Sequence, residues 1–353
     1  MRYYDLTLFN AAGVPYAVGA NGFTTGAAGQ PTFSSRLNGV NNPAALNVEW
    51  DIPIAPFATF QGLQSIRVWG IGLQMMAQAA LLSPASPGAL GAAFTLAAGM
   101  KPGLPLATAA AGQARVIAQG SVFQAFGNWQ GVNQTLELVV QSVALNPTGG
   151  IKWSWQPGQG LGAAIQNSLL AAYSASGYSV PTPNVAASIV QQQSTKNVSG
   201  AYPSLDAFAS MILEQSKAIG AQQTGNAQYP GVAIVCFGKT IYVYDYSWTG
   251  APVQLAFQDL IGQPTWINPA TVNFRAVMRG DLQVGSQVKF PTGIVSPYAL
   301  TTATAAVPGT PARNASAFQG TFVVTEVHHF ANFRQADADS WVTAFNAVPY
   351  IGA

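Results

Sequence analysis

Charged residues are scarce in this sequence. Asp, Glu, Lys and Arg make up 7% of its 353 residues, whereas hydrophobic residues make up 49%. An ordinary soluble domain has about 25% charged residues and uses them to stay soluble as a free chain. Here the surface must be built from neutral polar residues or be covered by other subunits. Because uncovered apolar surface promotes association, the composition favours a subunit of a larger assembly.

Clusters of basic residues and long apolar runs are also lacking. The formal net charge is +2, and no run of Lys or Arg forms the basic stripe that binds a phosphate backbone. The uncharged stretch between Arg67 and Lys101 is broken by Gly70 and Pro84, so it never reaches the ~20 apolar residues of a spanning helix. No secretory signal is predicted at the start. We expect no sequence-specific binding of nucleic acid and no stable membrane insertion.

Cysteine and histidine are nearly absent. The single cysteine, Cys236, excludes an intrachain disulfide and a cysteine-based zinc site, and its apolar surroundings predict a buried, inert thiol. The only histidines are His328 and His329. Neighbours on a strand point to opposite faces, so these two cannot share a metal ion. We expect structural roles for all three residues.

Two pairs of carboxylates are of the type used in acid–base and calcium sites. Glu49 and Asp51 share a strand face, and Asp337 and Asp339 flank a turn. Neither pair belongs to a wider calcium-loop or glycosidase pattern, so turn solvation or an ion pair between subunits is the favoured interpretation. No catalytic residue, cofactor or metal ion is predicted.

The glycine-rich segment 158–162 resembles a phosphate loop only superficially, because no lysine follows it and no strand is predicted directly before it. The tryptophans allow sugar binding as a hypothesis, but packing in cores and interfaces explains most of them. They include Trp129, Trp153, Trp155, Trp248, Trp266 and Trp341.

Alternating polarity predicts strands at both ends of the chain, and a period near 3.6 predicts helices in its middle. Two segments, 81–108 and 291–314, are predicted to be long loops. The predicted strands are 3–9, 46–54, 65–73, 114–125, 135–144, 271–277, 284–290, 318–330 and 340–348. The predicted middle section has helices at 161–172 and 205–219, the second capped by Ser204 and ended by Gly220, a strand at 185–190 and a hairpin at 232–246.

An internal repeat links the two β-rich parts. The segment 120–143 can be laid on 325–348 without a gap, and residues 66–68 match 274–276 at nearly the same offset. Two matches that share an offset are stronger than either alone. The predicted fold is therefore mainly β with an α/β insert. Two copies of one β-domain, 1–148 and 253–353, flank an α/β domain, 149–252.

Two motifs in the second β-domain are distinctive. The run Asp-Leu-Ile-Gly-Gln-Pro-Thr-Trp occupies 259–266, and Gly280, Asp281, Gly285 and Val288 follow the spacing G-D-x-x-x-G-x-x-V. This text resembles baseplate hub proteins of contractile-tailed bacteriophages and related injection machines. The general layout extends the resemblance to most of the chain, whereas the specific motifs lie within 255–348.

The resemblance implies that each β-domain is a tube-like β-barrel and that three chains form a ring of six similar barrels. Such a homotrimer would adapt the hexameric tail tube to the trimeric central spike and line the DNA channel. It implies the tail tube protein, the spike protein and other baseplate proteins as partners. It also implies a place in the virion after assembly in the cytoplasm of a bacterial host. A duplicated domain suits this role, because a three-fold ring then presents six like surfaces.

A non-enzymatic function is therefore expected. Arg67 and Arg275 occupy matched positions in the two β-domains, and we expect them to contact tube subunits in equivalent ways. Three alternatives remain open at this point. They are a tail tube or other ring-forming protein, a tail-tip peptidoglycan hydrolase, and a carbohydrate-binding module.

Overall fold

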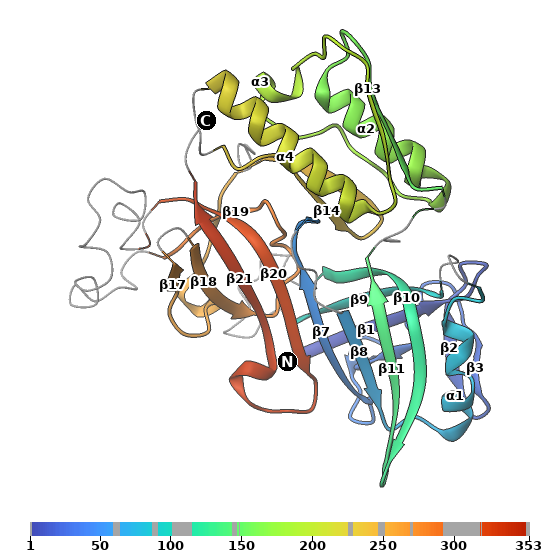
Figure 1. The fold of residues 1–353 in the computed structure, drawn as a ribbon. Helices are drawn as coiled ribbons and strands as arrows, with labels where there is room; N and C mark the ends of the chain where they lie inside the picture. Colours follow the sequence, from blue (N-terminus) through green and yellow to red (C-terminus); the bar gives the residue numbers. More distant parts are fainter. Residues whose placement is uncertain are drawn as a thin grey trace.

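The computed structural model describes residues 2–58, 64–86, 91–100, 115–142, 147, 149–224, 229–245, 251–268, 271–291, 318 and 320–350. Within these residues 13 strands form one large sheet (Figure 1). Its main path runs β17 (Thr265–Asn268), β18 (Thr271–Val277), β21 (Trp341–Pro349), β20 (Phe322–Asn332), β7 (Asn47–Ile54), β8 (Gln64–Trp69), β11 (Asn133–Gln141), β10 (Arg115–Gln130), β9 (Ala93–Met100), β1 (Arg2–Phe9) and β4 (Phe33–Ser34). Beside β20 lie β19 (Gln287–Lys289) and its parallel partner β16 (Val253–Gln254).

One face of this sheet is apolar and buried, and the other is polar and exposed. In β7, Val48, Trp50 and Ile52 are buried, whereas Glu49 and Asp51 alternate with them on the other face. The period of two in the sequence therefore selects which face forms the core. Residues from both ends of the chain share one hydrophobic cluster.

The middle of the chain forms a smaller α/β unit above the sheet in Figure 1. It contains α2 (Leu161–Tyr173), α3 (Ala187–Val190) and α4 (Leu205–Thr224). They pack with two antiparallel pairs, β12 (Ile151–Trp155) with β13 (Val198–Tyr202) and β14 (Ala233–Phe237) with β15 (Thr240–Tyr244). A second hydrophobic cluster fills this unit.

The β14–β15 hairpin lies between the two cores. Ala233 and Val235 belong to the core of the large sheet, whereas Ile234 and Cys236 belong to that of the α/β unit. Alternation along one strand thus contributes side chains to both clusters. The insert is packed against the sheet, since Phe57 N–H donates to Ile234 C=O at 2.8 Å.

The predicted fold class, mainly β with an α/β insert, is confirmed. Several predicted details are wrong. Residues 93–100 of the predicted loop 81–108 form β9, which pairs with both β1 and β10. The predicted strand 185–190 contains α3 instead. The predicted loop 291–314 lies almost wholly outside the described residues.

Helix α4 does not stop at Gly220 but continues to Thr224. The glycine serves packing rather than termination, because a Cβ there would lie 2.3 Å from the Tyr229 ring. The start of the helix agrees with the prediction, since Ser204 Oγ accepts a hydrogen bond from Ala207 N–H at 3.1 Å.

The repeat is present, but its gapless alignment is out of register. Each hairpin, β10–β11 and β20–β21, has a bulge, which follows Val122 in the first copy and Val324 in the second. Superposing the bulges makes Val122 equivalent to Val324, whereas the gapless alignment sets it against Val327. The cause is loop length, because residues 131–132 join β10 to β11 and the longer segment 333–340 joins β20 to β21.

The upstream match has the correct register. Arg67 lies opposite Glu137 in β11, and Arg275 lies opposite Ala344 in β21. When the two hairpins are superposed on their bulges, Glu137 and Ala344 fall at equivalent positions. Arg67 and Arg275, which lie opposite them, therefore occupy the same place in the two copies. The strand order β7-β8-β11-β10-β9 of the first copy is repeated as β17-β18-β21-β20-β19 in the second.

Candidate functional site

Arg67 and Arg275 both lie on the polar face of the sheet, about half exposed. Arg67 donates to both carboxylate oxygens of Glu137, at 2.6 and 2.8 Å, and its guanidinium lies 5.4 Å from the Trp69 ring centre. Arg275 instead donates to Asp339 at 3.0 Å. The two arginines are therefore equivalent in backbone position and differ in their carboxylate partners.

The carboxylate pairs lie along a shallow groove on the polar face. Its volume is about 550 Å³, and Glu49, Asp51, Arg67, Asp337 and Asp339 are among its lining residues. Each pair is engaged within the chain. Glu49 accepts a hydrogen bond from Asn332 at 2.6 Å, and Asp51 binds His328. Within the described ranges, no group of three or more His, Cys, Asp or Glu converges as metal ligands.

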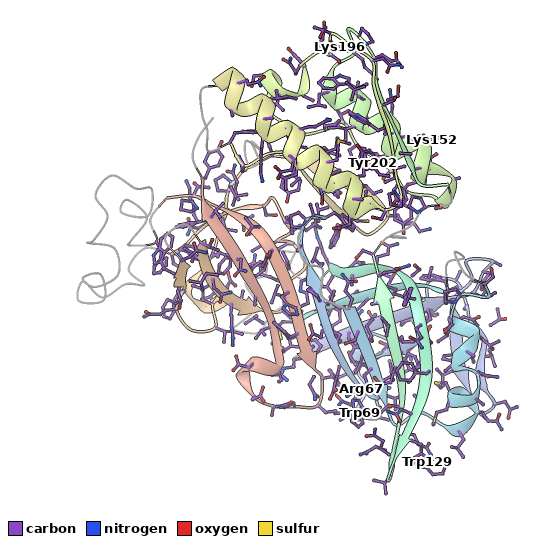
Figure 2. The ribbon with its side chains drawn as sticks, in the orientation of Figure 1. Arg67, Trp69, Trp129, Lys152, Lys196 and Tyr202 are labelled. Atoms are coloured by element: carbon purple, nitrogen blue, oxygen red, sulfur yellow. The ribbon has the colours of Figure 1, made fainter. Side chains whose placement is uncertain are left out.

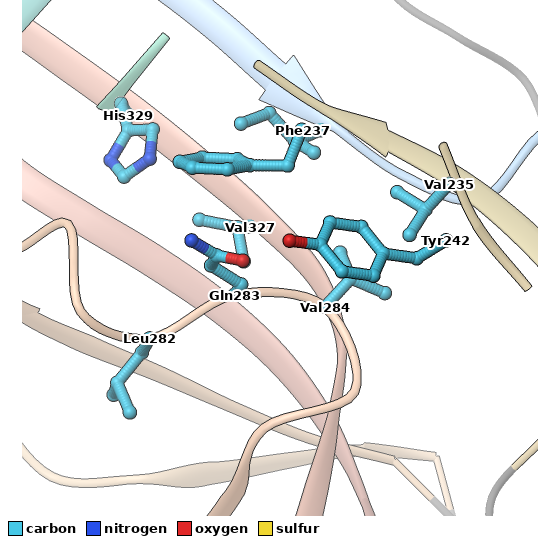
Figure 3. Close-up of a pocket in the computed structure, with 9 residues that line it drawn as sticks. Val235, Phe237, Tyr242, Leu282, Gln283, Val284, Val327 and His329 are labelled. Atoms are coloured by element: carbon cyan, nitrogen blue, oxygen red, sulfur yellow. The ribbon is translucent and has the colours of Figure 1, made fainter. Parts of the chain in front are cut away.

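The two histidines point to opposite faces, as predicted. His328 lies on the polar face with Asp51, whereas His329 is buried and its Nδ1 lies 3.0 Å from Thr343 Oγ1. Burial, with a smaller contribution from His328, lowers the pKa of His329 to about 3. The imidazole lies beside Phe237 at a cavity of about 10 Å³ that Gln283 and Tyr242 also line (Figure 3). That is the lower limit for one water molecule.

Cys236 is buried, and its Sγ lies 3.4 Å from the carbonyl oxygen of Gly238. Burial raises the pKa of its thiol well above the ordinary value. A reactive thiol requires the opposite shift, so the geometry agrees with an inert structural residue.

The glycine-rich segment 158–162 follows a strand after all, since β12 ends at Trp155. The start of α2 is nevertheless occupied by the chain itself, because Leu161 N–H donates to Gln192 C=O at 2.9 Å. A Cβ at Gly162 would lie 2.0 Å from Val190. These glycines allow α2 to pack against α3, and the site is not open to a phosphate.

An ion-pair cluster was not found from the sequence. Arg279 is 3% exposed and makes a bidentate contact with Asp281, at 2.8 and 2.7 Å. Asp259 lies 3.5 Å away on its other side. Asp259 and Asp281 come from the two motifs of the second β-domain, so the motifs meet in space at Arg279. Their spacing along the chain gave no sign of this contact.

Exposed aromatic and aliphatic side chains mark two places on the large sheet. Trp129, 59% exposed, and Phe126, 42% exposed, lie on the distal half of β10, and Val132 follows at the tip of the hairpin. Figure 2 shows Trp129 at this tip, on the side away from the α/β unit. Ile267, 56% exposed, lies on β17 at the opposite end of the strand order. Of the tryptophans expected to pack, Trp153, Trp155 and Trp341 are buried.

No helix within the described residues has the length and apolar character needed to cross a bilayer.

No protein-family profile and no curated protein sequence match the chain. Solved structures with similar folds have low sequence identity. The E. coli c3393 protein is a component of the type VI secretion system described as similar to the T4 bacteriophage tail proteins gp27 and gp5. It is 12% identical, with a TM-score of 0.49 over 90% of this chain and 76% of the other. A tail protein from Neisseria meningitidis MC58 is 8% identical, with a TM-score of 0.47 over 98% and 96%.

A third structure is the 43 kDa tail protein of prophage MuSo2 from Shewanella oneidensis. It is 10% identical to this chain, with a TM-score of 0.45 over 86% of this chain and 98% of the other.

Proposed function

We propose that the chain is a structural subunit of a phage-type contractile tail, acting as its baseplate hub. Three copies form a ring that joins the hexameric tail tube to the trimeric central spike and surrounds the DNA channel. The proposal includes the tube protein, the spike protein and other baseplate proteins as partners, and the virion as the final location.

The internal duplication supports this proposal most directly. Two sheets of the same strand order are fused edge to edge by β20 and β7, with Val327 opposite Ile54 and Asn332 opposite Glu49. A unit that adds to the edge of its own copy can add again to the next chain, and such head-to-tail contacts produce a ring when the rotation closes. Two units per chain and three chains give six like surfaces.

Such a ring would explain the low charge content. Strand edges and apolar side chains that would promote aggregation in a free monomer become subunit contacts. The two motifs that carry the resemblance to hub proteins meet in space at the buried Arg279.

No catalytic role is proposed. The carboxylates of the polar face are held in contacts within the chain, and a general acid or base needs a carboxyl group positioned toward a substrate. The groove they line is shallow.

Cryo-electron microscopy of the assembled tail tests the proposal. We expect three copies of the chain between tube and spike, with Arg67 and Arg275 placed alike toward successive tube subunits. A six-fold ring of this chain within the tube would instead identify it as a tube protein. Its absence from the tail would overturn the proposal.

A further inference from the structure

One edge in each repeat has no neighbouring strand within the described chain. Strand β9 pairs with β10 only along Arg115–Ser121, and the Ser83 side chain bonds both the N–H and the C=O of Ala125. The N–H and C=O groups of successive residues point alternately to the two edges of a strand. Those of Gly127 and Trp129 therefore point to the same outer edge as those of Ala125. At the other end of the sheet, β17 pairs with β18 only.

The internal junction shows how two such edges fit together. There Phe330 of β20 lies opposite Asp51 of β7. Superposing the bulges of the hairpins β10–β11 and β20–β21 makes Asn128 equivalent to Phe330. Thr265 is equivalent to Asp51, because Thr265 lies opposite Asn273 as Asp51 lies opposite Ser65.

We propose that β10 of one copy pairs antiparallel with β17 of the next copy, with Asn128 opposite Thr265. The pairing repeats the β20–β7 junction between chains, and it rests on the proposed ring. In this register, the neighbouring residues on either side are also paired. Gly127 lies opposite Trp266, and Trp129 lies opposite Pro264.

Side-chain size supports this register. In the internal junction the small Ala331 of β20 lies opposite the large Trp50 of β7. In the proposed junction the sizes are exchanged, since the large Trp129 lies opposite the compact Pro264. Each junction therefore has one tryptophan and one small partner at the same place on the apolar face. Pro264 has no N–H, so Trp129 N–H donates to the carbonyl oxygen of Pro264 and this pair forms one hydrogen bond in place of two.

The same pairing explains the exposure of Trp129, Phe126 and Ile267 in the isolated chain. Trp129 lies on the face that forms the core, where its equivalent Ala331 is 7% exposed, yet Trp129 is 59% exposed. A second copy would cover it. Phe126 and Ile267 are both exposed on the isolated chain, and in the proposed register they lie opposite each other.

Disulfide trapping in the full-length chain tests the register. In antiparallel strands the pair Asn128–Thr265 would be of the non-hydrogen-bonded type, with Cα atoms about 4.5 Å apart, which a disulfide can bridge. We expect the double variant Asn128→Cys, Thr265→Cys to form covalent oligomers on mild oxidation, visible on a non-reducing gel and lost on reduction. Cys236 stays in all variants, because its buried thiol is inert.

The matched control is Phe123→Cys with Thr265→Cys. Phe123 is exposed on the same strand but lies five residues away, about 16 Å along β10 by the rise per residue, so no cross-link should form. A trimeric mass by light scattering without a cross-link in the first variant would overturn the pairing and leave the proposed ring intact. A chain that stays monomeric in every variant would contradict both.

Discussion

Ala331 lies directly opposite Trp50 where the two repeats of the chain meet. Trp50 is 4% exposed, and its ring packs edge to face on Trp341 at 4.9 Å between centroids. Ala331 is 7% exposed, so both side chains are buried at the junction. A single chain already contains one complete example of the contact that a ring would use between chains.

Removing Trp50 should destabilise the folded chain strongly. Truncating a buried tryptophan leaves a cavity and costs about 3–5 kcal/mol, so Trp50→Ala should lower the midpoint of urea unfolding, followed by circular dichroism. Trp129→Ala is the matched control. Its exposed side chain should change the stability of the monomer by no more than about 0.5 kcal/mol while reducing assembly in light scattering. Equal losses of stability in the two variants would contradict the assigned burial.

The Arg279 cluster should matter far more than the Arg275 ion pair. Arg279→Met leaves the buried carboxylate of Asp259 and the partly buried one of Asp281 without their cation, which costs about 3–5 kcal/mol. Arg275→Met removes an exposed ion pair with Asp339 and should cost less than about 1 kcal/mol. Chemical denaturation of both variants gives the comparison. If Arg279→Met unfolds at the wild-type midpoint, the cluster has no stabilising role.

His329 should make the fold sensitive to acid. Its folded pKa of about 3 lies below the ordinary value of 6.5, so between these values the unfolded chain binds a proton that the folded chain does not. The free energy of unfolding should therefore fall as the pH is lowered from about 6.5 toward 3, by at most about 1.4 kcal/mol per pH unit from this group. His329→Gln should remove this contribution, as measured by unfolding at pH 7, 5 and 4.

His328→Gln is the control for that experiment. It leaves the buried imidazole in place, so the acid-dependent loss of stability should persist. If His329→Gln and wild type lose the same stability over this pH range, the neutral buried histidine is not responsible.

The thiol of Cys236 should be unreactive in the folded chain. Burial both raises its pKa and blocks access, and thiol reagents react with the thiolate. An aromatic disulfide reagent should label no thiol in buffer and one thiol per chain in guanidinium. Rapid labelling of the folded protein would show that the β14–β15 hairpin opens readily.

Most strands could be predicted because one face of the sheet is buried and the other is exposed to solvent. Apolar and polar residues therefore alternate along each strand. Strand β9 was missed because Ala93–Met100 consists mainly of small residues. It pairs with β10, the next strand, and with β1, which lies at the distant start of the chain. Helix α3 was read as a strand because so short an apolar segment fits either period. In both cases tertiary contacts determine the outcome.

The repeat itself could be inferred from the sequence, but its register could not. Two bulges and unequal loops shift the strands of one copy against the other, and a gapless comparison cannot represent that. Likewise, Asp259 and Asp281 belong to motifs that are visible in the sequence, but nothing in their spacing indicates that folding brings both to Arg279. The proposed pairing of Asn128 with Thr265 depends on the corrected register.

Light scattering of the purified chain, followed by class averages from electron microscopy, tests the central claim most directly. The account predicts a mass of three chains and a three-fold ring whose wall contains six similar sheet segments. A monomer at all concentrations, or a particle in which the two repeats make unlike contacts, would contradict it.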